Sequence, residues 1–203
     1  MPRPKVHDES LRLRLLEAAG HTLSTQGLAA LSLRRLAAEA GTSTTAVYSL
    51  FGGKPGLLKA LFDEAFRRLG EHLATVTPTD DPIEDMVALG LAYRDSALAD
   101  PHFYDVMFTS PKTDLPLDEE SVALATAAFE QLLRLVERAV GAGTLRPEAD
   151  AATVSLALWA MVHGLVSLQL RDFLPPGAGD PKVVFEAAVR ANLGGWRARP
   201  GPA

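Results

Sequence analysis

The chain has 203 residues, enough to bury a hydrophobic core in one domain or in two small ones. It contains no cysteine, which excludes disulfide bonds, thiolate zinc sites, iron–sulfur clusters and thiol catalysis. With 20 Lys and Arg against 25 Asp and Glu the net charge is −5, and this average argues against a nucleic-acid partner.

Alanine and leucine dominate the apolar residues. Each occurs 32 times, against 14 valines and a single isoleucine, Ile83. Strong helix formers thus crowd out β-branched residues. No long segment alternates with period two, whereas many segments follow the i, i+3, i+4 spacing of amphipathic helices. The sequence therefore predicts an all-α fold.

Glycine and proline divide the chain into expected helices. These cover about residues 8–26, 33–41, 44–51, 55–75, 83–98, 101–108, 118–141, 148–173 and 181–196. Residues 78–82 form a polar linker, and residues 109–117 and 174–180 are proline-rich loops. This pattern predicts a small N-terminal unit, residues 1–53, which the fourth helix connects to a larger helical remainder, residues 54–203.

Two segments bear on cellular location. The basic N-terminus is not followed by an apolar signal-peptide region, which favours a cytoplasmic protein. Residues 151–170 carry no formal charge over 20 positions, the minimum length for a bilayer span. They include Thr153, Ser155 and His163, however, and have no cluster of flanking basic residues. We therefore interpret this segment as a fully buried central helix.

The segment from Ser32 to Phe51 reads SLRRLAAEAGTSTTAVYSLF, and its spacing fits a helix-turn-helix. Gly41 supplies the positive φ that a tight turn needs, and Ala37 is small where two helices would cross. The positions expected to face inward are Leu36, Ala40, Val47 and Leu50. An ordinary helical hairpin that stops at a glycine has the same spacing and is the alternative.

The residues of this region carry a family resemblance. Leu31–Gly41, together with Ala46-Val47-Tyr48, Phe51, Lys54 and Leu57-Leu58, resembles the N-terminal domain of tetracycline-repressor (TetR) family regulators, over roughly residues 15–62. The resemblance implies a three-helix DNA-binding domain within residues 1–53, whose third helix lies in the major groove. It also implies a ligand-binding and dimerising domain within residues 54–203.

The resemblance assigns DNA contacts by position. Tyr48 and Lys54 resemble the family's phosphate contacts, and Lys54 precedes a helix whose N-terminal N–H groups also attract phosphate. A solvated surface lysine is the alternative for Lys54. The third helix has no Arg, Lys, Asn or Gln, so we expect base recognition through hydroxyls, a thymine methyl contact and DNA shape. The expected DNA-binding residues are Ser32, Arg34, Arg35, Thr44, Thr45, Ala46, Tyr48, Ser49 and Lys54.

The net charge divides unevenly along the chain. Residues 1–70 contain 10 Lys and Arg against 6 Asp and Glu, a net charge of +4. Residues 71–203 contain 10 against 19, a net charge of −9. The expected DNA-facing part is therefore basic, and the objection from the overall charge no longer holds.

The C-terminal part contains a group of aromatic residues. Aromatic walls with a few polar tips suit a small-molecule pocket, although the same residues can form an ordinary core. Trp159-x-x-x-His163-Gly164 also resembles the signature of TetR regulators with a WHG-type C-terminal domain. His163 is either a ligand contact or a neutral core residue. The expected ligand-binding residues are Tyr93, Phe103, Tyr104, Met107, Phe108, Trp159 and His163.

Small residues follow one side of the last two expected helices. In TetR relatives the last two long helices build the dimer interface, and two copies of such a pair form a four-helix bundle. A dimer also matches paired DNA half-sites about 34–36 Å apart. The expected interface residues are Ala157, Ala160, Gly164, Ser167, Val184, Ala187, Ala188 and Ala191.

Catalytic motifs are absent from the sequence. There is no Gly-x-Ser-x-Gly elbow, phosphate-binding glycine loop or His-Glu-x-x-His site, and we expect no enzyme, metal or cofactor. The sequence predicts a cytoplasmic homodimeric transcriptional regulator, a repressor that binds a palindromic DNA operator and is released by an unknown small-molecule effector. One alternative is an effector-independent DNA-binding regulator whose aromatic cluster is only core. Another is a protein-interaction module that has lost DNA binding.

Overall fold

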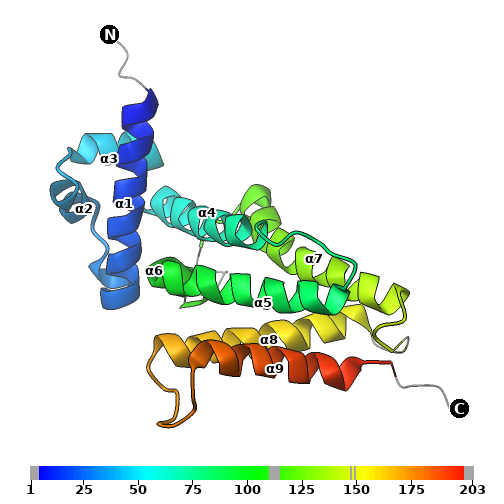
Figure 1. Ribbon diagram of the computed structural model, residues 1–203. Helices are drawn as coiled ribbons and strands as arrows, with labels where there is room; N and C mark the ends of the chain where they lie inside the picture. Colours follow the sequence, from blue (N-terminus) through cyan, green and yellow to red (C-terminus); the bar gives the residue numbers. More distant parts are fainter. Residues whose placement is uncertain (1–4, 110–114, 147, 149, 199–203) are drawn as a thin grey trace, which may run out of the picture. The chain divides into compact units, whose positions relative to one another are not determined.

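A computed structural model describes residues 5–109, 115–146, 148 and 150–198 (Figure 1). Within these residues every regular element is a helix, and the all-α prediction is confirmed. The elements are α1 Lys5–Gln26, the 3-10 helix η1 Leu28–Ala30, α2 Leu33–Glu39, α3 Thr44–Phe51, α4 Lys54–Leu73, α5 Pro82–Ala99, α6 Pro101–Thr109, α7 Glu119–Gly141, α8 Ala151–Leu170 and α9 Pro181–Trp196.

The helix ends follow from local capping chemistry. Asp150 caps α8 by accepting a hydrogen bond from the Thr153 backbone N–H (2.8 Å), so this helix begins later than expected. It ends at Leu170, before Asp172, whose φ of 55° is left-handed. Asp180 caps α9 in the same way, with Pro181 in its first turn.

The chain divides into two compact units. Unit 1 comprises Met1–Arg67 and Asp100–Ala125, and unit 2 comprises Arg68–Ala99 and Thr126–Ala203. The expected DNA-binding domain, residues 1–53, lies within unit 1, which also contains α6 and the first parts of α4 and α7. In unit 1, α1 packs against α6 and against α2. Its most buried large side chains include Leu15, Leu16, Phe62, Phe103 and Tyr104.

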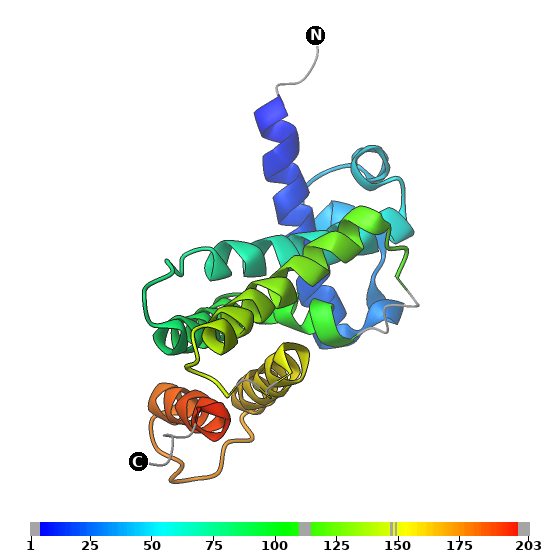
Figure 2. The same ribbon diagram turned by 90° about the vertical axis from the view of Figure 1, so that its right-hand side faces the viewer.

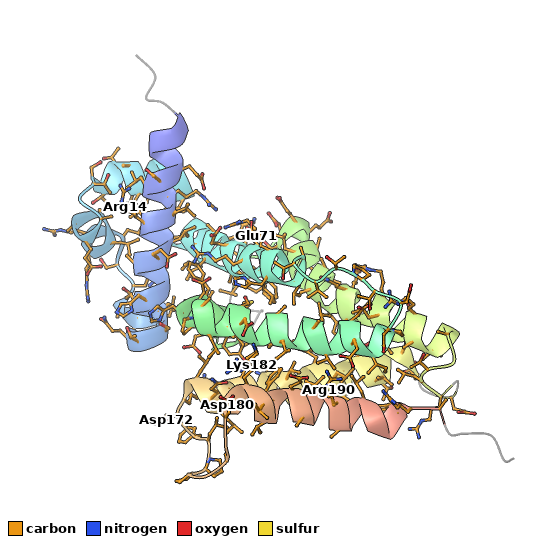
Figure 3. The ribbon with its side chains drawn as sticks, viewed as in Figure 1. Arg14, Glu71, Asp172, Asp180, Lys182 and Arg190 are labelled. Atoms are coloured by element: carbon orange, nitrogen blue, oxygen red, sulfur yellow. The ribbon has the colours of Figure 1, made fainter. Side chains whose placement is uncertain are left out.

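Unit 2 is built around α5, α8 and α9, which pack on one another. Figures 1 and 2 both show α8 and α9 side by side. Gly90 on α5 permits close packing, because a Cβ there would lie 3.4 Å from Val189 Cγ2. Arg190 on α9, labelled in Figure 3, donates to both carboxylate oxygens of Glu84 on α5 at 2.5 and 2.8 Å. A two-pronged ion pair thus joins these two helices.

The interpretation of residues 151–170 as a fully buried helix is wrong for the single chain. The buried residues of α8 are Val154, Ser155, Leu158, Val162 and Val166, whereas Leu156 and Leu168 are 55% and 43% exposed. Among the residues that the structure describes, α8 alone is long and apolar enough to cross a membrane, which is weak evidence for a span. Its uncharged sequence instead leaves an apolar side open.

Candidate functional site

The turn between α2 and α3 has the geometry of a helix-turn-helix. Gly41 has φ of 64°, and the Thr42 N–H donates to the Ala37 carbonyl oxygen at 2.8 Å. Ser43 caps α3, since its hydroxyl accepts from the Ala46 N–H at 3.1 Å. Leu36, Ala37 and Val47 are buried, and Ala40 and Leu50 are half-buried, as expected for inward-facing positions. The geometry follows each steric requirement of the motif.

The junction between α3 and α4 depends on close backbone contact. Gly52 ends α3 with φ of 70°, and its N–H donates to the Tyr48 carbonyl oxygen at 2.8 Å. A Cβ on Gly56 would lie 1.9 Å from the Phe51 carbonyl oxygen, so only glycine fits there without a shift. The Gly52-Gly53 break was predicted from the sequence, but the requirement for glycine at position 56 was not. The sequence feature that could have indicated it is a glycine within the first turn of an expected helix.

The nine expected DNA-binding residues lie on α2 and its N-cap position, on α3, and at the first residue of α4. Tyr48 is 55% exposed although its neighbour Val47 is fully buried. Ser32 occupies the N-cap position of α2, but its hydroxyl makes no capping hydrogen bond and stays at the surface. The exposed members are Ser32, Arg34, Arg35, Thr45, Tyr48 and Ser49, and the half-buried members are Thr44, Ala46 and Lys54.

Two of the three expected basic contacts already have partners within the chain. Lys54 Nζ donates to the Leu28 carbonyl oxygen at 2.9 Å. Arg35 donates to Glu39 Oε1 at 2.7 Å and to Gln26 Oε1 at 3.0 Å. Arg34 makes no hydrogen bond or ion pair with any residue that the structure describes, and it is exposed. Neither η1, which provides the Leu28 carbonyl, nor these pairings were predicted from the sequence.

The seven expected ligand-binding residues fall into two sets, one in each unit. In unit 1, Phe103, Tyr104 and Met107 are buried, and the Tyr104 and Phe108 rings lie 5.1 Å apart. Tyr93, Trp159 and His163 belong to unit 2. A single pocket formed by all seven stays a prediction.

Within unit 2 the aromatic set contains a polar pair. Tyr93 Oη and His163 Nδ1 lie 3.2 Å apart, and the Trp159 ring lies 5.8 Å from that of Phe129. Burial lowers the pKa of His163 below its ordinary value of 6.5, and the positive charge of Arg171 lowers this pKa further. The imidazole is therefore neutral at pH 7, and one ring nitrogen can accept a hydrogen bond.

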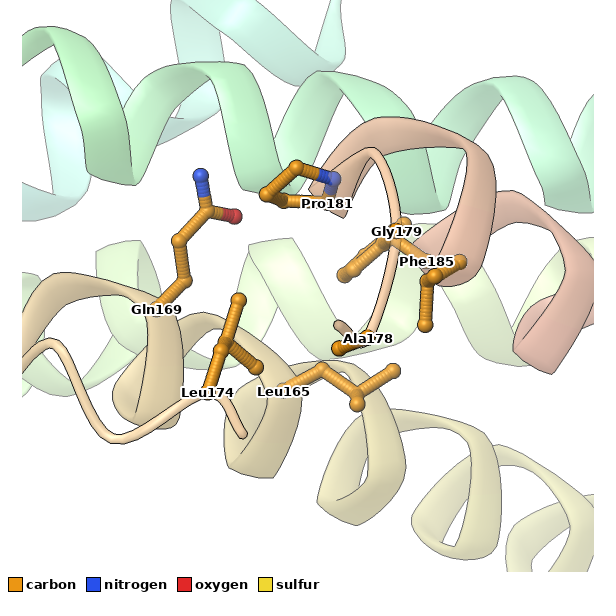
Figure 4. Close-up of a pocket in the computed structure, with 8 residues that line it drawn as sticks. Leu165, Gln169, Leu174, Ala178, Gly179, Pro181 and Phe185 are labelled. Atoms are coloured by element: carbon orange, nitrogen blue, oxygen red, sulfur yellow. The ribbon is translucent and has the colours of Figure 1, made fainter. Parts of the chain in front are cut away.

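A cavity of about 20 Å³ lies between the end of α8, the α8–α9 loop and the start of α9 (Figure 4). This is room for about one water molecule. None of the expected ligand-binding residues lines it, and it was not predicted from the sequence. The lining residues are Leu165, Gln169, Leu174, Ala178, Gly179, Pro181, Val184 and Phe185.

The eight expected dimer-interface residues all lie outside the buried side of α8 and α9. Ala160, Ala187 and Ala191 are exposed, and the other five are half-buried. Larger apolar side chains accompany them, since Leu156 on α8 and Val183 on α9 are 55% and 66% exposed. The two helices thus present an open apolar face, which we define as the α8–α9 face.

Comparison with known proteins places the chain among regulators. Residues 15–61 match the family model of bacterial regulatory proteins of the tetR family. Residues 86–192, more than half of the chain, match the Tetracyclin repressor-like C-terminal domain. A WHG-type C-terminal domain is not separately distinguished by this match and stays a prediction.

Relatives and solved structures agree with these matches. An HTH-type transcriptional regulator of Mycobacterium bovis is 25% identical over 213 residues, covering 90% of each chain. A Rhodococcus sp. RHA1 protein of unknown function is 30% identical, with a TM-score of 0.79 over 96% of this chain and 100% of that chain. The TetR family regulator PfmR of Thermus thermophilus is 26% identical, with a TM-score of 0.72 over 89% of this chain and 97% of that chain. The chain therefore belongs to the TetR family of DNA-binding transcriptional regulators.

Proposed function

We propose that this regulator is a cytoplasmic homodimeric repressor, not an enzyme, that binds a palindromic operator and leaves it when a small molecule binds. The observation that carries the proposal is the exposed side of α3, where Thr45, Tyr48 and Ser49 project while Val47 and Phe51 are buried. Such a helix offers hydroxyl groups to a DNA groove and keeps its apolar side in the core.

The proposed DNA contacts divide into two classes. Arg34, Tyr48 and Lys54 contact phosphates and fix the position of the protein on the duplex. Thr45 and Ser49 contact base edges, and Ala46 packs on a thymine methyl group. Because hydroxyl contacts discriminate weakly, DNA shape supplies further specificity. Lys54 has three N–H donors and uses one on Leu28, which leaves two for a phosphate.

Dimerisation through the α8–α9 face supports binding to paired half-sites. This face carries exposed leucine and valine side chains beside small residues. Exposed apolar side chains favour burial in an interface, and small residues allow two helices to pack closely. A two-fold interface places the same residues of both copies in contact. It would also cover the apolar side of α8 that the single chain leaves open.

The effector response is proposed for the aromatic residues of the C-terminal part. The Tyr93–His163 pair supplies a hydroxyl and a neutral imidazole next to apolar side chains, a combination that orients a small ligand. The water-sized cavity and the complete burial of Phe103 and Tyr104 favour the second candidate, an effector-independent regulator whose aromatic residues are only core.

One experiment tests the proposal in two stages. Selection of DNA sequences by the purified full chain should return a palindrome, and footprinting should show two half-sites about 34–36 Å apart. A library of small molecules is then screened for release of this DNA. Selection of no common sequence would overturn DNA recognition by α3, whereas a palindrome that no compound releases would favour the effector-independent regulator.

A further inference from the structure

Two histidines from separate helices of unit 1 meet near the protein surface. His21 lies on α1 and His102 on α6, 81 positions later, and Figure 1 shows α6 beside the C-terminal half of α1. The His21 Nδ1 and His102 Nε2 atoms are 3.0 Å apart, and the two ring planes meet at 85°. The rings therefore approach through their nitrogen atoms and do not stack. Because so many residues separate them, no sequence motif links the pair.

Ser24, one turn after His21 on α1, fixes the tautomer of His102. Its hydroxyl donates its single hydrogen to the His21 carbonyl oxygen at 3.2 Å. The same hydroxyl oxygen lies 2.7 Å from His102 Nδ1, so it accepts a hydrogen bond from the Nδ1–H group. His102 Nε2 therefore carries a lone pair and accepts from His21. Histidines that bind metal ions are oriented in this way, with the second ring nitrogen donating to a neighbouring oxygen.

The pair is accessible from solvent and is held by packing. His21 is exposed, and His102 and Ser24 are half-buried. A Cβ on Gly20 would lie 3.9 Å from His102 Cβ, so α1 rests directly on α6 at this point. In the part of the chain that the structure describes, no group of three or more His, Cys, Asp or Glu could hold a metal ion. An ion at this pair would therefore keep water in its remaining coordination positions.

We propose that His21 Nδ1 and His102 Nε2 bind a divalent late transition-metal ion, Ni²⁺ or Cu²⁺, which connects α1 to α6. Imidazole is a preferred ligand of both ions, and both favour square-planar geometry. Two nitrogens bound at about 2.1 Å and at a right angle stand about 3.0 Å apart, close to the observed separation. Tetrahedral coordination, as for Zn²⁺, would place them about 3.4 Å apart.

Binding requires one proton to change its position on His21. In the free pair the His21 Nδ1–H group donates to His102 Nε2. In the metal-bound pair the Nδ1 lone pair binds the ion, and Nε2 of the exposed ring carries the proton, which exchanges through water. The neutral pair therefore takes up the ion without a net loss of protons. Two metal–nitrogen bonds replace one hydrogen bond, so the ion should stabilise the packing of α1 on α6.

The test titrates the full-length protein, without a histidine tag, with Ni²⁺ in a calorimeter. Ni²⁺ should bind at one site per chain and raise the Tm, whereas Mg²⁺, which prefers oxygen ligands, should do neither. Removal of a ligand should cost at least as much as removal of its supporting group, so His21→Gln and His102→Gln should each weaken binding by at least about tenfold. His72→Gln removes a half-buried histidine in unit 2 and should leave binding unchanged.

Ser24→Ala keeps the proposal testable if His102→Gln does not fold. It retains both histidines but removes the oxygen that orients His102, so Ni²⁺ affinity should fall by about tenfold. Electron paramagnetic resonance of bound Cu²⁺ should show two imidazole nitrogens in the wild type and one in His21→Gln.

Ni²⁺ affinity that is the same in His21→Gln as in the wild type would overturn the site, as would a Cu²⁺ spectrum with a single nitrogen in the wild type. These measurements involve no DNA, so the metal site and the proposed repressor function fail or hold independently.

Discussion

Lys54, the first residue of α4, donates a hydrogen bond from Nζ to the carbonyl oxygen of Leu28 in η1, at a distance of 2.9 Å. This bond fixes the lysine beside the helix-turn-helix before any DNA is bound. A side chain already held in one place loses less conformational entropy when it binds a phosphate. The bond therefore joins α4 to η1, and we propose that it also prepares Lys54 for a phosphate contact.

Lys54→Gln should weaken binding to all operator sequences alike, because a phosphate contact carries no base information. The slope of log affinity against log salt concentration should fall by about one. Loss of the bond to Leu28 should also lower the free energy of unfolding by about 1 kcal/mol. Salt-titrated fluorescence anisotropy measures the slope, with Lys182→Gln on α9 as control (Figure 3). A change in base preference would contradict the assignment.

Thr45→Ala should have the opposite signature. Removal of the exposed hydroxyl should change the ranking of operator variants, by about 0.5–1.5 kcal/mol at the contacted base pair. The salt dependence should stay the same, because no charge is removed. Binding to a set of single-base operator variants measures both, and Thr77→Ala, at an exposed position between α4 and α5, is the matched control. An equal loss on every variant would reassign Thr45 to the DNA backbone.

Three glycines should respond differently to alanine. Gly41→Ala should cost about 1–2 kcal/mol, because its φ of 64° strains an L-residue although the space around it is open. Gly56→Ala should cost about 3 kcal/mol, the upper end for an overpacked site, because the new Cβ meets the Phe51 carbonyl. Gly70→Ala, in an open position within α4, should stabilise the protein by about 0.5–1 kcal/mol. Urea unfolding gives all three values, and equal effects would refute the distinction.

Ala187→Glu on the α8–α9 face should weaken dimerisation by roughly 3 kcal/mol, or about a hundredfold, because the interface would bury an unpaired carboxylate. Ala74→Glu, at an exposed position after α4, controls for the added charge. Sedimentation velocity over a range of concentrations measures the dimer dissociation constant. A dimer of unchanged strength would show that another surface holds the two copies together.

His163 should make stability depend on pH. Because its pKa is lowered in the folded state, the unfolded chain binds protons more readily, and the free energy of unfolding should fall as the pH drops below about 6.5. His163→Gln should remove this contribution between about pH 5 and 8.

The buried Asp85 does not contribute to the pH dependence in this range. Burial raises its pKa, but hydrogen bonds from Thr79 and Arg138 lower it below 3.8, so its stabilisation is lost only at more acidic pH.

Parallel pH profiles for the wild type and His163→Gln would show that His163 does not cause the dependence. The comparison also bears on the Tyr93 contact, since a protonated imidazole no longer offers the acceptor nitrogen that the neutral ring has.

Much of the candidate site follows directly from sequence. The positive φ at Gly41, the inward positions Leu36 and Val47, and the exposed Thr45 and Ser49 depend on spacing within one short segment. Local steric rules therefore determine them. The hydroxyl-rich character of α3 is a property of its residues and needs no tertiary information.

Other features depended on residues far apart in the chain. The bond from Lys54 to Leu28, the meeting of His21 with His102, and the clash that requires glycine at position 56 appear only when separate elements pack. The sequence of α8 is apolar on every side of the helix, so its periodicity could not show which side packs against the rest of the chain. The sequence alone determined the helices, their turn and the family, because these are local patterns. The tertiary structure decided which charges are paired and which apolar surface stays open, because both depend on long-range contacts.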